Sequence, residues 1–155
     1  MTTVYTTHPR YVDHDPPGHS EHAGRIRAVW QRLDETGLAA RMQAVEAPEV
    51  DDDLILTVHT PDYLDLLRRV SVMERTMLLD ADTYAGPDAL EIARLSAGAV
   101  AAVDAVLAGR AANGPAVVRP PGHHAMPDHG MGFACSATSP SPRASPSAST
   151  GSSAC

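Results

Sequence analysis

Aromatic residues are scarce in this chain of 155 residues: they make up 4% of it, whereas hydrophobic residues as a whole make up 43%. At this length we expect a single domain, whose core has to be packed mainly from alanine, valine and leucine. The chain also lacks an excess of positive charge, because 12 basic residues stand against 19 acidic ones and give a net charge of −7. This balance argues against a nucleic-acid groove and is compatible with a cationic substrate.

Long apolar runs and cysteines are few as well. The most apolar stretch, residues 95–108, has 14 residues and is interrupted by Asp104, whereas a membrane-spanning helix needs about 20. Two cysteines, Cys135 and Cys155, do not make a disulfide framework, and no secretion signal opens the chain. We therefore expect a cytoplasmic protein with no membrane partner.

Short strand-like segments alternate with helical patterns along the chain. Residues 2–7, 42–47 and 115–118 predict short strands. Such alternation predicts an α/β fold with a mostly parallel sheet, in which functional loops follow the carboxyl ends of the strands. The expected helices run from a cap at Ser20 to Gly37, from a cap at Thr60 along a buried stripe of Tyr63, Leu67 and Val70, and from Pro87 to Gly109 with Val103 on the buried face.

The most unusual segment is VVRPPGHHAMPDHGMGF, residues 117–133. Two prolines stiffen the exit from the expected strand, and Gly122 permits a close approach of the backbone. His123 and His124 then present two imidazoles, and adjacent residues of an extended loop would point to opposite sides. From the residue types alone, a general base, a metal ligand and a purely structural pair all remain open.

Several short motifs resemble, in order, those of one enzyme family. RPPGHHA and GMGF are preceded by HDPPGHSEHAGR, VHTPDYL, and DADTYAG with a helical SAGA run, all within residues 5–133. This set is similar to the zinc-dependent histone deacetylase family, which includes the acetylpolyamine amidohydrolases. The resemblance implies part of an arginase-like, three-layer α/β fold with a mostly parallel sheet, and a substrate that is an acetylated lysine or an acetylated polyamine.

The resemblance implies a role for each histidine of the pair. His124 resembles the family's general base, which acts on a zinc-bound water that attacks the acetamide carbonyl. His123 resembles its inward neighbour, which helps to stabilise the charged transition state. Three earlier histidines, His14, His19 and His22, lie in a segment that the family uses at the rim of its site, and we expect them to be structural or solvated.

A substrate slot is implied too. Gly132 and Phe133 match the wall of the family's narrow tunnel for an acyl-lysine chain. Asp82 matches a rim aspartate that receives the substrate's backbone or amine, and Arg25 matches an arginine that lines an internal channel. Each position has a structural alternative, because an apolar ring usually packs in a core, an aspartate often shapes a turn, and an arginine is often a surface charge.

Metal ligands are missing after the histidine loop. No Asp or Glu follows Asp128 and no His follows His129, whereas the family's zinc ligands, an Asp-x-His element and a further aspartate, lie beyond the segment that Phe133 matches. We therefore expect this chain to form no metal site and to bind no zinc, the cofactor of the intact family. General-base help without an activated water is worth only about 10²–10⁴-fold, so we expect the chain by itself to be inactive.

The composition changes abruptly after Phe133. Residues 136–155 contain eight serines and three prolines, a composition that cannot offset the entropy of ordering. We therefore divide the chain into residues 1–133, the amino-terminal part of a deacetylase-like domain, and residues 134–155, a disordered Ser/Pro/Ala-rich tail. A frameshift near Ala134 is our hypothesis for the change.

Three functional interpretations follow. The first is an enzyme lineage that hydrolyses the amide of an acetylated amine. The second is a non-catalytic binding or regulatory fragment that keeps an acyl-lysine-shaped surface. The third is a non-functional truncated product. The sequence carries no signal for one particular acylated substrate or for an oligomeric state.

Overall fold

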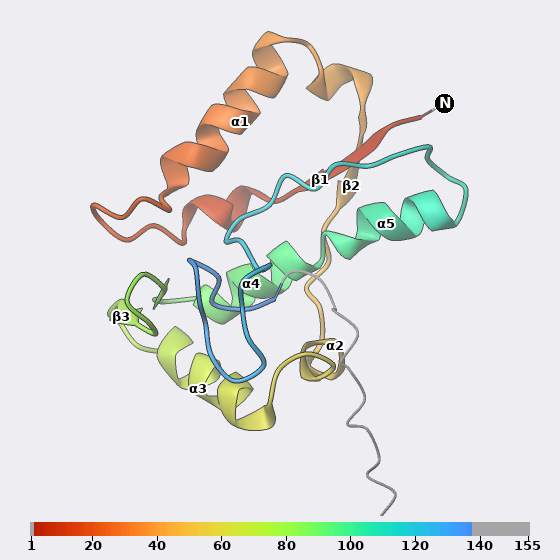
Figure 1. Ribbon diagram of the computed structural model, residues 1–155. Helices are drawn as coiled ribbons and strands as arrows, with labels where there is room; N and C mark the ends of the chain where they lie inside the picture. The colour runs from red at the N-terminus through yellow and green to blue at the C-terminus, as the bar shows by residue number, and fades with distance from the viewer. Residues whose placement is uncertain (1, 138–155) are drawn as a thin grey trace, which may run out of the picture.

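The computed structural model describes residues 2–137 (Figure 1). Short strands and helices alternate along it, as the sequence pattern predicts. The strands are β1 (Val4–Thr7), β2 (Gln43–Glu46), β3 (Met77–Leu78) and β4 (Tyr84–Ala85). The helices are α1 (Ala23–Glu35), α2 (Asp52–Leu56), α3 (Pro61–Ser71), α4 (Ala89–Ala97) and α5 (Val100–Leu107), with short 3-10 turns η1 (Pro9–Val12) and η2 (Ala39–Arg41).

A small parallel sheet lies at the centre of the described chain. β1 pairs in parallel with β2, from Val4 opposite Gln43 onward. On the other side of β1 the chain around Ala116 also runs in parallel, and the backbone N–H of Val117 donates to the carbonyl of Thr6 at 2.9 Å. Residues 115–118 form a single isolated bridge, at Ala116, rather than the predicted strand, because Pro115 has no N–H to donate to a regular ladder.

Helices cover both faces of β1, since successive side chains of a strand point to opposite faces. Val4 is buried against Ala102 and Ala105 of α5. Thr7 faces α1, where its Oγ1 accepts a hydrogen bond from the indole N–H of Trp30 at 2.8 Å. The strand is thereby held between the two helices (Figure 1).

Of the two helix caps predicted from the sequence, one is confirmed and the other is wrong. Thr60 caps α3 as predicted, because its Oγ1 accepts from the backbone N–H of Tyr63 at 3.3 Å. The cap of α1 is His22, whose Nδ1 accepts from the N–H of Gly24 at 3.1 Å. The prediction of Ser20 is therefore wrong by two residues, because an imidazole nitrogen here performs the task usually given to a hydroxyl or carboxylate.

The predicted helix from Pro87 to Gly109 is two helices, α4 and α5, that meet at Gly98. A Cβ on Gly98 would lie 1.9 Å from the carbonyl oxygen of Pro48, so only glycine allows this approach. The break also reorients α5. Val103, predicted to be buried, is 52% exposed.

The scarce aromatic rings are concentrated in the core. Tyr11, Tyr63 and Tyr84 are all at most 3% exposed. Tyr63 packs with Leu64 and Leu67, and Tyr11 packs with Ile92, aliphatic side chains of the kind that the composition predicts. Among residues 2–137, no helix has the length and apolar character needed to cross a membrane.

The predicted tail boundary at residue 134 falls too early. Ala134 and Cys135 are fully buried and Ser136 is 3% exposed, so these three residues pack with the histidine loop rather than beginning a disordered segment. The rest of the predicted tail, residues 138–155, lies outside the described part of the chain.

Candidate functional site

A buried arginine fixes the start of the histidine loop. Arg119 is 2% exposed and its Nε lies 2.7 Å from a carboxylate oxygen of Glu21. Its guanidinium also donates to the carbonyl of Tyr11 at 2.6 Å and to the hydroxyl of Tyr84 at 3.0 Å. Burial raises the pKa of Glu21 from its ordinary value, and the charge of Arg119 opposes that rise. The arginine thus joins two loops that leave neighbouring parallel segments at their carboxyl ends, as the sheet argument predicts.

The two histidines lie at the tip of a tight turn. The backbone N–H of Ala125 donates to the carbonyl of Gly122 at 3.4 Å, which closes the turn around His123 and His124. Both side chains are exposed, and their ring centroids are 4.1 Å apart with a tilt of 50°. The expectation that they point to opposite sides is wrong, because alternation applies to an extended backbone and not to the central positions of a turn.

Gly132 lies directly beneath His124. A Cβ on Gly132 would come within 2.9 Å of the imidazole Cγ, and its φ is +58°, so both the space and the backbone conformation require glycine here. The structure therefore brings together two residues that the sequence assigned to one site. The next residue, Phe133, also has a positive φ of 68°, which is uncommon for a side chain of this size.

Phe133 is held by its backbone and by its ring. Its N–H donates to Thr83 Oγ1 at 3.2 Å, and the Thr83 hydroxyl donates to Asp82 Oδ1 at 3.3 Å. Its ring meets the ring of His19 edge to face, with centroids 5.1 Å apart. Asp82 is therefore linked to the loop through Thr83, a contact that no short-range pattern in the sequence indicates.

His59, two residues before the start of α3, holds both ends of the segment from residue 127 to residue 137. His59 Nδ1 lies 3.3 Å from the carbonyl of Pro127, while its Nε2 accepts from the N–H of Ala137 at 2.9 Å. Since a carbonyl only accepts and an N–H only donates, the proton of the neutral ring is on Nδ1. Burial lowers the pKa of His59, which favours that neutral form.

Tyr63, in the first turn of α3, completes this attachment. Its hydroxyl donates to the carbonyl of Cys135 at 2.6 Å. His59 and Tyr63 belong to the matched motif VHTPDYL, but His59 has no predicted role and Tyr63 is predicted only as part of the buried stripe of its helix. No helical spacing indicates this pairing, because His59 precedes the cap of α3 at Thr60.

The early histidines have structural roles. His14 is 2% exposed and stacks on Tyr84, with ring centroids 4.4 Å apart. Burial lowers the pKa of His14 to about 3. His19 meets Tyr84 edge to face at 4.8 Å and forms a bridge from that ring to Phe133, whereas His22 is the helix cap.

Arg25 lies behind the histidine loop rather than in it. Its side chain is 58% exposed and its guanidinium is 3.2 Å from Glu21 Oε1. It lines a cavity of about 220 Å³ together with Glu21, Arg119, Pro121 and apolar side chains of Ile26, Val29 and Val118. Its role in an internal channel stays a prediction.

The described residues do not fit a zinc site. Between residues 2 and 137 no group of three or more His, Cys, Asp or Glu side chains is placed to hold a metal ion. A catalytic zinc needs about three such donors and an open position. The histidine pair alone therefore does not provide one.

Comparisons with known proteins place this arrangement among the deacetylases. Residues 19–138 match the family model described as histone deacetylase domain. A histone deacetylase-like amidohydrolase of Pseudomonas aeruginosa is 46% identical over 117 residues, which cover 75% of this chain and 30% of that protein. The polyamine deacetylase HDAC10 of Homo sapiens is 38% identical over 126 residues, which cover 77% of this chain and 19% of that protein.

A solved structure is similar as well. The HD domain of HDA15 superposes with a TM-score of 0.83 at 30% identity, covering 89% of this chain and 41% of that one. The chain thus spans less than half the length of these relatives, and what it shares with them is their amino-terminal, deacetylase-type α/β arrangement.

Proposed function

Because this chain belongs to the histone deacetylase family, we propose that it supplies the general-base loop and part of the substrate wall of a site that recognises an acetylated amine. The observation that carries this proposal is the packing of the His124 imidazole on Gly132. A Cβ placed on Gly132 would lie 2.9 Å from the imidazole Cγ. The exposed imidazole therefore lies beside the residue that precedes Phe133, and we propose that the ring of Phe133 borders the same surface.

His124 is the residue that would move a proton in amide hydrolysis. When water adds to the acetyl carbonyl, the imidazole accepts a proton from it. The C–N bond then breaks, and the proton passes to the departing amine, so that acetate and a free amine result. Such general acid–base help contributes about 10²–10⁴-fold. Since the described residues do not fit the family's zinc, we propose that this chain alone binds the acetylated amine without turning it over.

The attachment of the loop supports binding without catalysis. Phe133 is fixed through Thr83, while Tyr63 of α3 and His59 just before that helix fix the segment that follows. The surface is therefore ordered by protein contacts alone, and pre-organisation of this kind lowers the cost of binding. The net charge of −7 favours substrates with a cationic amine, which an acetylated polyamine retains.

The experiment measures metal content, turnover and binding on the same preparation. The purified chain is loaded with zinc and dialysed, and its metal content is measured by mass spectrometry. Amine release from an acetyl-lysine peptide and from a monoacetylated diamine is followed, and peptide binding is measured by fluorescence anisotropy. We expect zinc far below one ion per chain, no amine release, and saturable peptide binding.

Two variants distinguish specific peptide binding at this surface from non-specific hydrophobic adsorption. Phe133→Ala should weaken peptide binding by about tenfold, since burial of an aromatic face on a methylene chain is lost. Met131→Ala, an exposed apolar change on the same loop, should leave the affinity unchanged. Stoichiometric zinc with turnover that His124→Ala abolishes would overturn the claim of no catalysis, and absence of binding to either ligand would overturn the whole proposal.

A further inference from the structure

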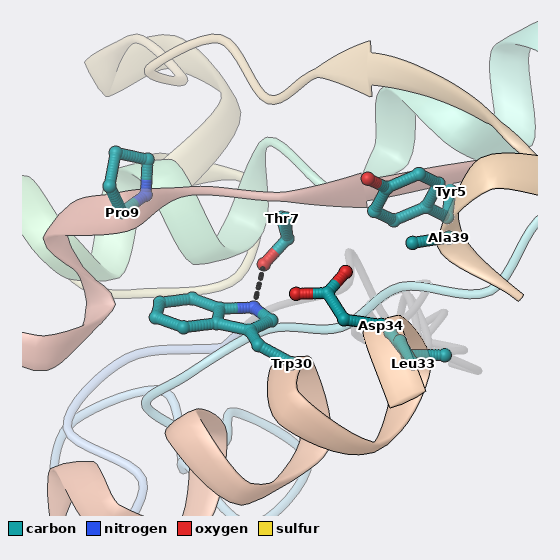
Figure 2. Close-up of a pocket in the computed structure, with 7 residues that line it drawn as sticks. All are labelled: Tyr5, Thr7, Pro9, Trp30, Leu33, Asp34 and Ala39. Carbon is teal, nitrogen blue, oxygen red and sulfur yellow. Dashed lines mark hydrogen bonds between the residues drawn. The ribbon is translucent and has the colours of Figure 1, made fainter. Parts of the chain in front are cut away.

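A second cavity lies away from the histidine loop, between β1 and α1 (Figure 2). Its volume is about 260 Å³, the size of a small ligand rather than of a drug-sized one. None of its lining residues belongs to the segment 117–137. They are Tyr5, Thr7, Pro9, Trp30, Leu33, Asp34 and Ala39.

Two aromatic rings form opposite parts of its wall. The indole of Trp30 is fixed in orientation, because its N–H donates to Thr7 Oγ1 at 2.8 Å. Tyr5 projects from the same face of β1 as Thr7, since the two positions differ by two residues along the strand. The ring faces of tryptophan and tyrosine carry negative electrostatic potential and attract cations.

A carboxylate points between these rings. Figure 2 shows the side chain of Asp34 directed from α1 into the space between the rings of Trp30 and Tyr5. Within residues 2–137, Asp34 shares no side-chain hydrogen bond or ion pair, whereas its neighbour Glu35 accepts from Gln31 and pairs with Arg32. The lining set contains no arginine or lysine, so the negative charge at this cavity has no basic partner among its walls.

We propose that this cavity binds a small alkylammonium cation, with the charged head between Asp34 and the rings of Trp30 and Tyr5. The carboxylate supplies the opposite charge, and the rings replace part of the water that surrounds the ion. An anionic ligand is disfavoured by the same carboxylate. A neutral apolar ligand would gain the contact with the rings but nothing from Asp34.

The chain provides its own probe, because Trp30 is the only tryptophan. Its fluorescence is followed during titration with choline, and separately with 3,3-dimethylbutan-1-ol, which has the same shape without the charge. Sodium chloride is added to keep the ionic strength equal. We expect a saturable change in emission with choline at a Kd on the order of millimolar, as suits an open cavity of this size. The neutral alcohol should bind about tenfold more weakly.

Two variants of adjacent residues locate the charge. Asp34→Asn should weaken choline binding by about tenfold and remove the preference over the alcohol, because the ion loses its counter-charge at contact distance. Glu35→Gln removes the same charge from the next position of α1 and should leave the affinity unchanged. Equal affinity for choline and the alcohol in the unmodified chain, no saturable change with choline, or equal losses in the two variants would each overturn the proposal.

Discussion

Three buried tyrosines show how few aromatic rings can join distant segments. Tyr11 donates its hydroxyl to the carbonyl of Leu95, and Tyr84 donates to the carbonyl of Glu21. Tyr63 reaches Cys135 in the same way. Burial raises the pKa of each of these hydroxyls. Each tyrosine therefore stabilises the fold in two ways, because its ring fills space in the core and its hydroxyl donates a hydrogen bond to a buried carbonyl.

The stacked histidine beneath Tyr84 makes stability depend on pH. His14 has a folded-state pKa of about 3 against an ordinary value of 6.5. Below about pH 6.5 only the unfolded chain takes up this proton, so stability is complete above that pH and falls toward pH 3. Between pH 7.5 and 5.5, we expect His14 to cost the chain about 1.4 kcal/mol of its free energy of unfolding. Urea unfolding at the two pH values measures this loss.

The contribution of His14 is isolated by comparing variants. His14→Phe keeps a ring against Tyr84 but cannot titrate, so its stability should fall less on acidification by about the same amount. His59 and Asp52, whose pKa values are lowered as well, contribute to the acid sensitivity that remains. His129→Gln, an exposed change, should retain the full pH dependence. An identical pH dependence in His14→Phe and the unmodified chain would show that the stacked ring does not titrate as inferred.

At the scale of single residues, part of the candidate site was predicted from the sequence. The proximity of His124 and Gly132 follows from their separation of only eight positions and from a glycine-rich pattern. The links through Thr83 and His59 were not predicted, because each joins residues at least 50 positions apart. Such contacts depend on how the elements pack, and no local periodicity encodes them.

At the scale of the helices and strands, the break between α4 and α5 depends on one close backbone contact between the end of α4 and the chain before α2. Gly98 ends α4 at a point where a Cβ would lie 1.9 Å from the carbonyl oxygen of Pro48. Gly98→Ala should therefore lower the free energy of unfolding by about 3 kcal/mol, because backbone atoms rather than a flexible side chain have to move. Urea unfolding followed by circular dichroism gives the value.

A second glycine serves as the control for this change. Gly37 follows α1 with φ of +66° and has open space where a Cβ would be. Gly37→Ala should cost only about 1–2 kcal/mol, the penalty of a left-handed backbone without a clash. If Gly98→Ala proves no more destabilising than Gly37→Ala, the contact with Pro48 does not set the break between α4 and α5.

Element types were predicted better than element ends. β1, β2 and α3 lie where periodicity and capping placed them. The break at Gly98 was not predicted, because glycine within a helical pattern costs only about 1 kcal/mol and does not reveal what packs against it. The 115–118 segment has strand-like residues, but its proline limits the ladder to one isolated bridge.

At the scale of the whole molecule, large apolar side chains remain at the surface. Leu107 is 80% exposed and Val103, one turn earlier on α5, is 52% exposed. Contiguous apolar surface of this kind favours association. We expect the chain to self-associate, and the pair Val103→Glu with Leu107→Glu to raise the concentration of half-association by about tenfold. Sedimentation velocity over a concentration series measures the shift.

A control is needed, because two added negative charges increase the repulsion between chains and can weaken association wherever they are placed. The pair Ala28→Glu with Ala40→Glu adds the same two charges at other exposed positions and should leave the association of the chain nearly unchanged. A chain that is monomeric throughout the series, or equal shifts in the two double variants, would contradict a role for α5.

Arg119 donates a hydrogen bond to the carbonyl of Tyr11, which lies 108 positions earlier in the sequence. This sequence separation determines the order in which contacts can form while the chain is being synthesised. At about 5–20 residues per second, synthesis of the intervening stretch takes roughly 5 to 20 s. During that interval Glu21 is made early and Tyr84 only 35 positions before Arg119, and neither has its contact with the guanidinium until Arg119 has been made. Contacts of such high contact order form slowly. The nascent chain therefore acquires its helices early, and the turn with the two imidazoles takes its final position among the last.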